Sequence, residues 1–368
     1  VAPAVAESAM AERVAAAPLA DIEAYREELR GKFRATYSLV HGIAVKARQQ
    51  PMRIVYPHGA DTRIVRAARR VRDEGIASPI ILGPVDEIDA IARSIDIELD
   101  DIERLDPGLS PEMVERYAEG LLALRRRKGM TPEEARRSLH DPNYFAAMMA
   151  HYSDTDAVLG GLTTTYPATL RPALQVLPLE EGRTVVSALY VLVVRGRSFV
   201  FADCAVNIVP SAEQLAEIAL SAAKTARSEF DIEPRVALIS YSNFGSAHGE
   251  EPERVRRAVE ICRQAAPDLP LDGEMQADTA VVADLMERRA PFNQLGGEAN
   301  VLVFPNLTAA NASYKLLDRL GGAEVVGPIL TGLSKSVHVL QLDATVNDIV
   351  NLTAIAVLDA QRKQAATA

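Results

Sequence analysis

Three polar loops of this chain carry side chains of types that bind or activate ligands. They lie at residues 57–61, with a histidine and an aspartate, at 160–166, with three threonines and a tyrosine, and at 341–345, with a glutamine, an aspartate and a threonine. Each loop follows a short apolar run that is typical of a buried strand. Ligands of open α/β sheets bind beyond the carboxyl ends of the strands. We therefore expect the functional site at these loops.

Common catalytic and nucleotide-binding motifs are missing from the sequence. It contains no G-x-G-x-x-G, no G-x-x-x-x-G-K-[ST], no H-E-x-x-H and no G-x-S-x-G. The six histidines are scattered and form no pair at helical spacing, and the acidic pair Asp154 and Asp156 is more typical of a solvated loop than of a cation site. We therefore expect no metal site in this chain.

The elements that position these loops begin with an alternation of strand and helix patterns from Arg53 onward. This alternation predicts a parallel sheet with helices on both faces. The predicted strands are 53–56, 79–83 and 157–160, and the predicted helices are 62–75, 111–128, one that starts at Thr131, 141–151 and one that begins near Thr169.

From Thr184 the pattern becomes that of an antiparallel hairpin, with strands at 184–194 and 198–202 joined by a polar turn. Gly321 is expected at the left-handed position that ends a helix. These patterns together predict two α/β domains with a cleft between them. The remaining predicted elements are helix 211–227, strand 236–240, helices 252–266 and 278–289, strand 301–304, helix 309–320, strand 337–340 and helix 347–362.

The composition excludes several classes of protein. Apolar residues make up 48% of the 368 residues and charged residues 24%, a balance typical of a globular protein rather than a disordered one. The net charge of −10 argues against nucleic-acid and anionic-membrane partners, and no apolar run is long enough to span a bilayer. Cys204 and Cys262 show no metal spacing, so we expect buried thiols in a cytoplasmic protein.

Residues 1–50 are helical in pattern, with Asp21 as a helix N-cap. The chain starts with Val1 instead of methionine. One interpretation is a trimmed start. The other is that the chain is cut from a longer polypeptide, in which this segment is a helical linker from a preceding domain.

Six sequence motifs occur in the order in which they occur in a known family. Together they make the chain similar to the phosphotransacetylase (phosphate acetyl/butyryltransferase) family from Met52 to Gln361. The resemblance implies an isocitrate dehydrogenase-like fold of two α/β domains with the second inserted into the first, at 51–182 plus 331–368 and at 183–330. The motifs are RIVYPHGAD at 53–61, TLRPALQ at 169–175, FADCAVN at 201–207, DGEMQ at 272–276, the block 300–314 and GPIL at 327–330.

The resemblance also implies a site that moves an acetyl group between phosphate and coenzyme A. Such chemistry needs a base for the thiol and cations for the phosphate and the developing oxyanion. The family positions retained here are Arg171, Arg319 and Asp348. The family's Ser-Arg pair falls on Gln341 and Leu342, and loss of one transition-state donor typically costs about 10²–10³ in rate.

Two further observations bear on this implied site. Asp348 stands three residues after Thr345, which is also the spacing of a capping box at a helix start. Thr165 and Tyr166 replace the Ser-Thr pair that the family has on the phosphate side. We expect no catalytic residue in the full sense, and a ligand-binding set of Arg171, Arg319, Thr165, Gln341 and Asp348.

A narrower resemblance accounts for these departures. Residues 141–145 (DPNYF), 165–167 (TYP) and 21–26 (DIEAYR) look like the C-terminal phosphotransacetylase-like domain of large bacterial NADP-dependent malic enzymes and its linker. This resemblance implies a catalytically degenerate regulatory domain that senses acetyl-CoA. It also implies a homodimer or higher homo-oligomer, with the malic catalytic domain, its NADP and its divalent metal in cis.

Two other functions stay open at this point. The alternative is an active phosphate acetyltransferase that moves acetyl between acetyl phosphate and CoA. The third is an oligomerisation module with an empty cleft. A coupled assay with acetyl phosphate and CoA separates the first of these from the others.

Overall fold

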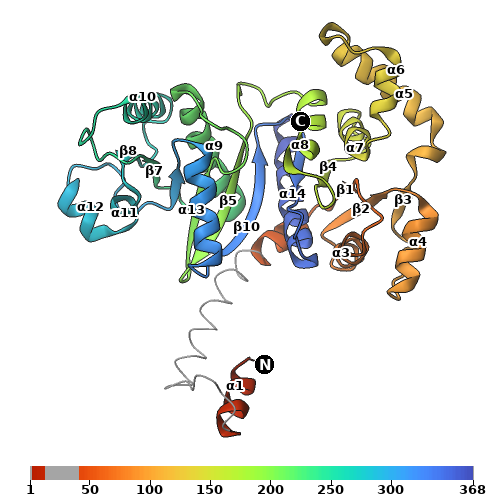
Figure 1. The fold of residues 1–368 in the computed structure, drawn as a ribbon, viewed down its shortest axis with the longest axis horizontal. Helices are drawn as coiled ribbons and strands as arrows, with labels where there is room; N and C mark the ends of the chain where they lie inside the picture. The colour runs from red at the N-terminus through yellow and green to blue at the C-terminus, as the bar shows by residue number, and fades with distance from the viewer. Residues whose placement is uncertain (1, 13–40, 368) are drawn as a thin grey trace.

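The computed structural model describes residues 2–12 and 41–367. Within these residues the chain forms two β-sheets that lie side by side, each with helices on both faces (Figure 1). The first sheet is parallel throughout, with the strand order β11-β4-β1-β2-β3. Its strands are β1 (Met52–Tyr56), β2 (Ala77–Leu82), β3 (Glu103–Leu105), β4 (Ala157–Gly160) and β11 (Ser336–Val339).

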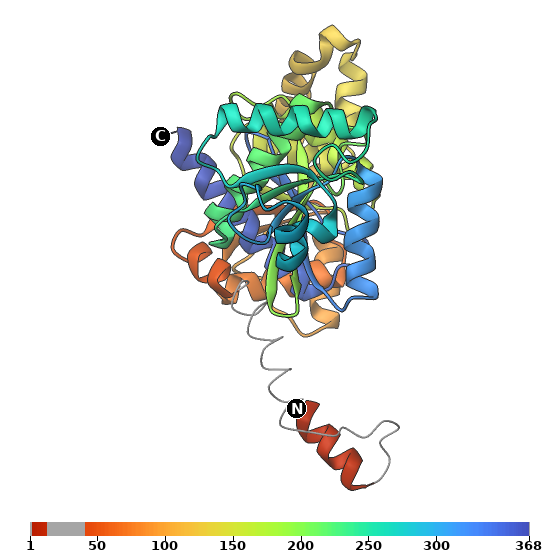
Figure 2. The ribbon, with the colours of Figure 1, turned by 90° about the vertical axis from the view of Figure 1, so that its left-hand side faces the viewer.

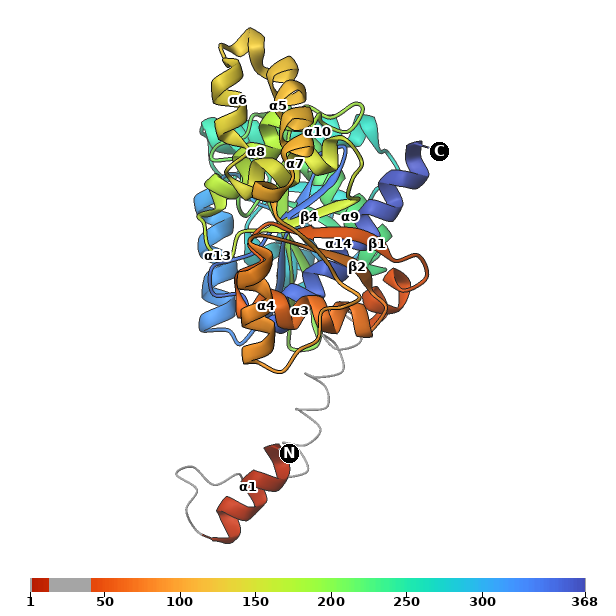
Figure 3. The same ribbon diagram turned by 90° about the vertical axis from the view of Figure 1, so that its right-hand side faces the viewer.

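Strand alternation gives the first sheet a separate core on each face. Ile54 and Tyr56 of β1 are fully buried in the core that includes α14, whereas Val55 is buried with α5 and α7 on the opposite face. Figure 3 shows α5 and α6 projecting from this domain. The helices are α3 (Thr62–Asp73), α4 (Val85–Ser94) and α14 (Val346–Thr367) on one face, and α5 (Pro111–Arg125), α6 (Pro132–Ser138), α7 (Pro142–His151) and α8 (Tyr166–Val176) on the other.

The second sheet is mixed, with the strand order β10-β5-β6-β9-β7-β8. The neighbours of β5 run antiparallel to it, and the other pairs are parallel. In Figure 2, α10 runs across the top of this domain and α13 along its right side. The strands are β5 (Ser187–Val194), β6 (Arg197–Ala202), β7 (Val236–Ile239), β8 (Leu271–Met275), β9 (Val301–Val303) and β10 (Glu324–Thr331), and the helices are α9 (Ala212–Phe230), α10 (Glu250–Ala265), α11 (Ala277–Val281), α12 (Ala283–Arg289) and α13 (Leu307–Arg319).

Helix α14 connects the two sheets. It packs on α3, β1, β4 and β11 of the first sheet and reaches α9 and β10 of the second. Ile349, Ile355 and Val357 are fully buried along it, and each such side chain contributes about 1.5–3 kcal/mol to folding. The predicted fold class, two α/β domains with the second inserted into the first, is therefore confirmed, while the predicted boundaries 182/183 and 330/331 stay predictions.

Several predicted elements differ from the structure. Elements α4, β3, β8 and β10 were not predicted, and the single helix predicted at 278–289 is instead the two helices α11 and α12. Helix α8 begins at Tyr166 instead of near Thr169. The left-handed residue after α13 is Gly322, with φ +63°, and not Gly321. A Cβ at Gly321 would lie 2.7 Å from the Leu317 carbonyl oxygen, so the glycine there serves close packing.

The amino-terminal part is described only in part. Helix α1 spans Ala2–Ala11, and 41–47 are helical. The predicted N-cap at Asp21 and the resemblance at 21–26 lie outside the described residues. No helix in the described ranges is long and apolar enough to cross a membrane.

Candidate active site

A cavity of about 610 Å³ opens where the two sheets meet. Its walls come from α13, from the first half of β10, from the loop 341–345 that follows β11, and from the start of α14. Three of the predicted site residues line it, namely Arg319, Gln341 and Asp348. The structure therefore brings together residues from the two domains, as an interdomain cleft requires.

The loop 341–345 is held in place from the first sheet. The Leu340 amide donates to the Gly160 carbonyl at 2.6 Å. Gly161 has φ +113°, and a Cβ there would lie 2.5 Å from the Leu340 carbonyl oxygen, so only glycine fits beside this strand end. The backbone of β11 and the loop after β4 are thus packed against each other directly below the cavity.

Arg63, at the start of α3, is the second support of this loop. Its Nη1 donates to the carbonyl oxygens of Leu342 at 2.9 Å and of Ala344 at 3.0 Å. Asp61, the N-cap of α3, accepts from Arg63 Nη2 at 2.9 Å and from Nε at 3.1 Å. Hydrogen bonds from a charged donor are about twice as strong as neutral ones. Arg63 was not among the predicted site residues, although it lies directly beside the 53–61 motif.

Gln341 points into the interior, against tyrosines of the second sheet. Its Nε2 donates to the Tyr190 hydroxyl at 2.7 Å. The Tyr190 ring stacks on Tyr314 with ring centroids 4.2 Å apart, and burial raises the pKa of the Tyr190 phenol. A Cβ at Gly327 would lie 2.7 Å from the Tyr190 ring, so the chain at β10 also packs closely here. Gln341 is therefore a fixed donor at the base of the cavity.

Leu342 has a different place from Gln341. Its side chain is 56% exposed and is not part of the cavity wall among the described residues. Its backbone carbonyl oxygen accepts a hydrogen bond from Arg63. The missing charge at this position therefore leaves the lining of the cavity unchanged in this conformation.

Arg319, one of two cations among the described residues that line the cavity, is balanced by acids. Arg319 lies 3.4 Å from Asp343 and 3.2 Å from Asp318, and its side chain is 73% exposed. Exposed pairs of this kind contribute about 0–1 kcal/mol, so Arg319 can exchange these carboxylates for a ligand anion at little cost. Lys315 lines the same wall.

Asp348 lines the cavity and also caps α14. Its Oδ2 accepts from the Thr345 amide at 2.8 Å and from the Thr345 hydroxyl at 2.7 Å, and its own amide donates back to that hydroxyl at 3.3 Å. The predicted capping box is thus present. Its Oδ1 has no hydrogen-bond partner among the described residues and remains available to a ligand.

Arg171, in the middle of α8, and Thr165, the N-cap of that helix, lie apart from this cavity. Both are exposed, and neither lines the cavity with Arg319 in the described chain. Arg171 makes no hydrogen bond or ion pair with a described residue. The predicted set of five residues is therefore divided between two places, with three residues in the cavity and two on α8.

Tyr166 connects these two places, although it was predicted only to replace a residue of the family's Ser-Thr pair. Its hydroxyl is buried and has no hydrogen-bond partner among the described residues. Burial raises the pKa of Tyr166, and the nearby Asp203 and Tyr314 act in the same direction. The phenol therefore extends from α8 toward the tyrosines below Gln341.

Among the described residues, no group of three or more His, Cys, Asp and Glu side chains is placed to hold a metal ion.

Comparisons with known proteins cover nearly the whole chain. The family model described as "Phosphate acetyl/butaryl transferase" matches residues 38–357. The phosphate acetyltransferase of Bacillus subtilis (strain 168) is 40% identical over 315 residues, which cover 84% of this chain and 95% of that protein. The phosphate acetyltransferase of Nitratidesulfovibrio vulgaris is 39% identical over 319 residues, covering 87% of this chain, and the matched part is 45% of that protein's length.

Solved structures give the same result. A phosphotransacetylase from Streptococcus pyogenes superposes with a TM-score of 0.83 at 36% identity, covering 89% of this chain and 99% of that one. The EutD phosphotransacetylase from Staphylococcus aureus superposes with a TM-score of 0.79 at 33% identity, covering 88% of this chain and 98% of that one.

The prediction of a catalytically degenerate regulatory domain is wrong in the light of these relatives. Proteins that align along nearly their full length at about 40% identity are phosphate acetyltransferases, and the solved relatives are phosphotransacetylases. The physical reason is that the prediction weighed Leu342 as a lost cavity residue, whereas its side chain lies outside the cavity wall among the described residues. The chain belongs to the phosphate acetyl/butyryl transferase family.

Proposed function

We propose that this chain transfers an acetyl group between acetyl phosphate and the thiol of CoA. The observation that carries the proposal is the interdomain cavity, where three family positions meet in a chain whose relatives of matching length are phosphate acetyltransferases. In the step itself the CoA sulfur bonds to the carbonyl carbon, the bond from that carbon to the phosphate oxygen breaks, and the thiol proton passes to a base. Phosphate and acetyl-CoA are the products.

Each cavity residue has a role suited to its surroundings. Asp348 Oδ1 is the proposed acceptor of the thiol proton, because its Oδ2 is occupied by the helix cap. The Gln341 amide, fixed on Tyr190, is the proposed donor to the developing oxyanion. Arg319 and Lys315 are the proposed contacts for phosphate oxygens. Arg171 and Thr165 are proposed to bind the phosphate group from α8.

Thioester formation from acetyl phosphate and CoA tests the proposal. We expect turnover on the order of 1–10³ s⁻¹, the usual range of enzymes. Replacement of Arg319 by Ala is expected to raise the KM for at least one of the two phosphate-bearing substrates, acetyl phosphate and CoA. Replacement of the exposed Arg288 by Ala on α12 serves as a matched control. A folded wild-type chain that forms no more thioester than the uncatalysed mixture would refute the proposal.

The narrower resemblance to a malic enzyme stays a prediction. It rests on 21–26, 141–145 and 165–167. The relatives named above do not support it because they are phosphate acetyltransferases and phosphotransacetylases. The coding sequence upstream of Val1 tests it, since NADP and metal sites of a malic domain would lie there in cis. Homo-oligomer formation is likewise a proposal, and light scattering coupled to size-exclusion chromatography measures it.

A further inference from the structure

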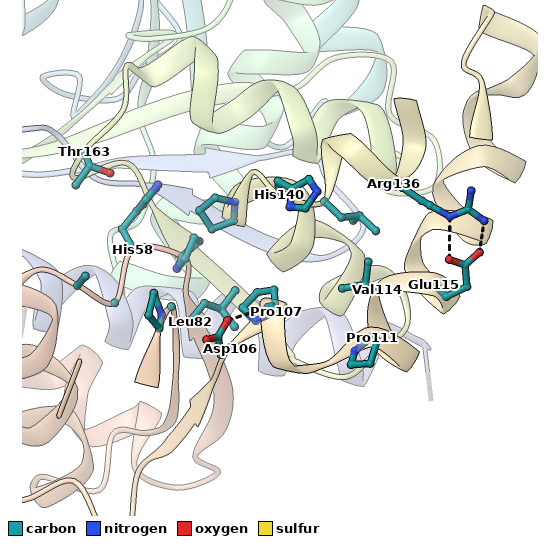
Figure 4. A pocket seen from close by; sticks show the side chains of 18 residues that line it. His58, Leu82, Asp106, Pro107, Pro111, Val114, Glu115, Arg136, His140 and Thr163 are labelled. Atoms are coloured by element: carbon teal, nitrogen blue, oxygen red, sulfur yellow. Dashed lines mark hydrogen bonds and ion pairs between the residues drawn. The ribbon is translucent and has the colours of Figure 1, made fainter. Parts of the chain in front are cut away.

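A second cavity, of about 660 Å³, lies above the carboxyl ends of the first sheet (Figure 4). Its walls are the loops after β1, β2, β3 and β4, together with parts of α5, α6 and α7. Among the described residues it shares no lining side chain with the cavity at Arg319 and Gln341. Its volume falls within the range of small-molecule sites, roughly 300–1,000 Å³.

The walls of this cavity are rigid and apolar. Leu82, Val114 and Leu139 supply aliphatic surface. The prolines present flat rings whose backbone is already fixed, so little freedom is lost when a ligand packs on them. Such walls suit a flat, stiff ligand. The prolines are Pro57, Pro84, Pro107, Pro111 and Pro142.

The charges around the cavity disfavour an anion. Helices α4, α5 and α7 all begin at its wall, and a helix start usually attracts phosphate. Here, however, α4 has Asp86 and Glu87 in its first turn and α5 has Glu112. Asp141, the N-cap of α7, already accepts from the Asn143 amide at 2.9 Å. Each of these helices therefore already has an acidic side chain at its N-terminus.

The cationic side chain that lines the cavity is also neutralised. Arg136 donates to Glu115 through Nε at 2.9 Å and through Nη2 at 2.5 Å, and this pair lies at the outer edge of the cavity (Figure 4). A phosphate or carboxylate would have to displace Glu115 and approach the acids of the helix starts. The surroundings therefore favour an uncharged ligand.

His58 supplies a hydrogen-bonding group that lacks a partner. Its Nδ1 is buried, and neither ring nitrogen has a hydrogen-bond partner among the described residues. Burial lowers the pKa of His58, and this effect exceeds the opposing influence of Asp141 and Asp61. A neutral imidazole offers one donor and one acceptor. His140 and Thr163 face the same space (Figure 4).

We propose that this cavity binds an uncharged heteroaromatic ring of the nucleobase type, with its faces against the proline walls and its polar edge paired with His58. The Nε2 of His58 lacks a partner among the described residues and, unlike Nδ1, is not fully buried. One net hydrogen bond contributes about 0.5–1.5 kcal/mol, so a ligand edge that pairs with Nε2 gains affinity. The expected source of the ring is a free nucleoside, because the adenine of CoA sits on a ribose whose phosphates would meet the acids of the helix starts.

Calorimetric titration of the full chain with adenosine tests the proposal. Adenosine is expected to bind saturably, and AMP more weakly, because its phosphate meets the acids of the helix starts. His58→Ala is expected to weaken adenosine binding about five-fold, the worth of one net hydrogen bond. Arg319→Ala, in the other cavity, is expected to leave the affinity for adenosine unchanged. Melting curves of each variant verify that it folds.

Three outcomes would overturn the proposal: adenosine does not bind at millimolar concentration, AMP binds more tightly than adenosine, or His58→Asn and His58→Ala both bind adenosine like the wild type. Saturating CoA is expected to leave adenosine binding unchanged, and loss of adenosine binding in its presence would be a fourth outcome that overturns the proposal. Because the readout is binding, a chain without transferase activity still gives an answer, so failure of the proposed function is distinguishable.

Discussion

At the scale of single residues, the loop that carries Gln341 depends on one distant arginine. Arg63 lies 279 residues before Leu342 in the chain and binds the carbonyls of Leu342 and Ala344. No local pattern of the sequence predicts such a contact, because the contact depends on how β1 and β11 are placed in the sheet. Gln341, Arg319 and Asp348 were predicted through the family resemblance, whereas the roles of Arg63, Tyr166 and Tyr190 required the structure.

Arg63→Ala is expected to lower kcat/KM for thioester formation by about ten-fold or more, because each hydrogen bond from a charged group contributes about 1.5–3 kcal/mol and two of them hold the loop. Arg63→Lys should not restore the rate, since an ammonium cannot reproduce the planar fork that joins both carbonyls and Asp61. Arg66→Ala, on an exposed position of the same helix, is the control. Wild-type kinetics in Arg63→Ala would show that the loop does not need this support.

At the scale of elements, the start of α14 combines a structural task with a proposed chemical one. Asp348 uses Oδ2 for the cap and leaves Oδ1 for the cavity. Thr345→Ala removes the cap hydroxyl but keeps the carboxylate. We expect it to cost about 1 kcal/mol of stability and to lower the melting temperature by a few degrees, with kcat changed less than about two-fold.

Asp348→Asn is expected to lose stability to a similar degree and also to reduce kcat about 10²-fold or more, the usual contribution of a general base. The comparison of the two variants decides between cap and base. If both keep the wild-type kcat, Asp348 is a helix cap alone, and another group takes the thiol proton.

The elements that were not predicted from the sequence have residue patterns that are atypical of their type, for physical reasons. Strand β3 has three residues, Glu103, Arg104 and Leu105, at the edge of the sheet, with too few apolar positions for a pattern. Strand β8 buries Asp272, whose charge is balanced by Arg263 at 2.6 Å, so it does not look like a core strand. Long apolar strands such as β5 and helices with clear caps such as α9 were predicted within a few residues.

At the scale of the whole molecule, the two domains meet at a buried cluster of charges. Glu229 of α9 is fully buried, 3.7 Å from Arg362 of α14, and Arg362 and Lys363 also bind Asp359 at 2.6 Å each. Burial raises the pKa of Glu229 to about 8, with the Asp359 charge acting in the same direction. The folded protein therefore keeps this carboxyl protonated at pH values where the unfolded chain ionises it.

The sign of the resulting pH dependence follows from linkage. Between pH values of about 4.5 and 8 the unfolded state binds fewer protons at Glu229, so this group lowers stability as the pH rises through that window. Glu229→Gln removes the effect. We expect its melting temperature, relative to the wild type, to increase from pH 5 to pH 8. Glu233→Gln, an exposed site just after α9, is the control, and parallel pH curves for Glu229→Gln and wild type would contradict the assignment.

The position of α14 also determines the order in which the protein can be built on the ribosome. All the strands of the second sheet leave the ribosomal tunnel before β11 and α14 do. Until those last elements emerge, β4 remains an open edge and the part of the first sheet that α14 covers stays exposed, a state that favours wrong strand pairing. The nascent chain can thus complete its second domain first. The cavity lined by Arg319, Gln341 and Asp348 forms only when translation has passed residue 348.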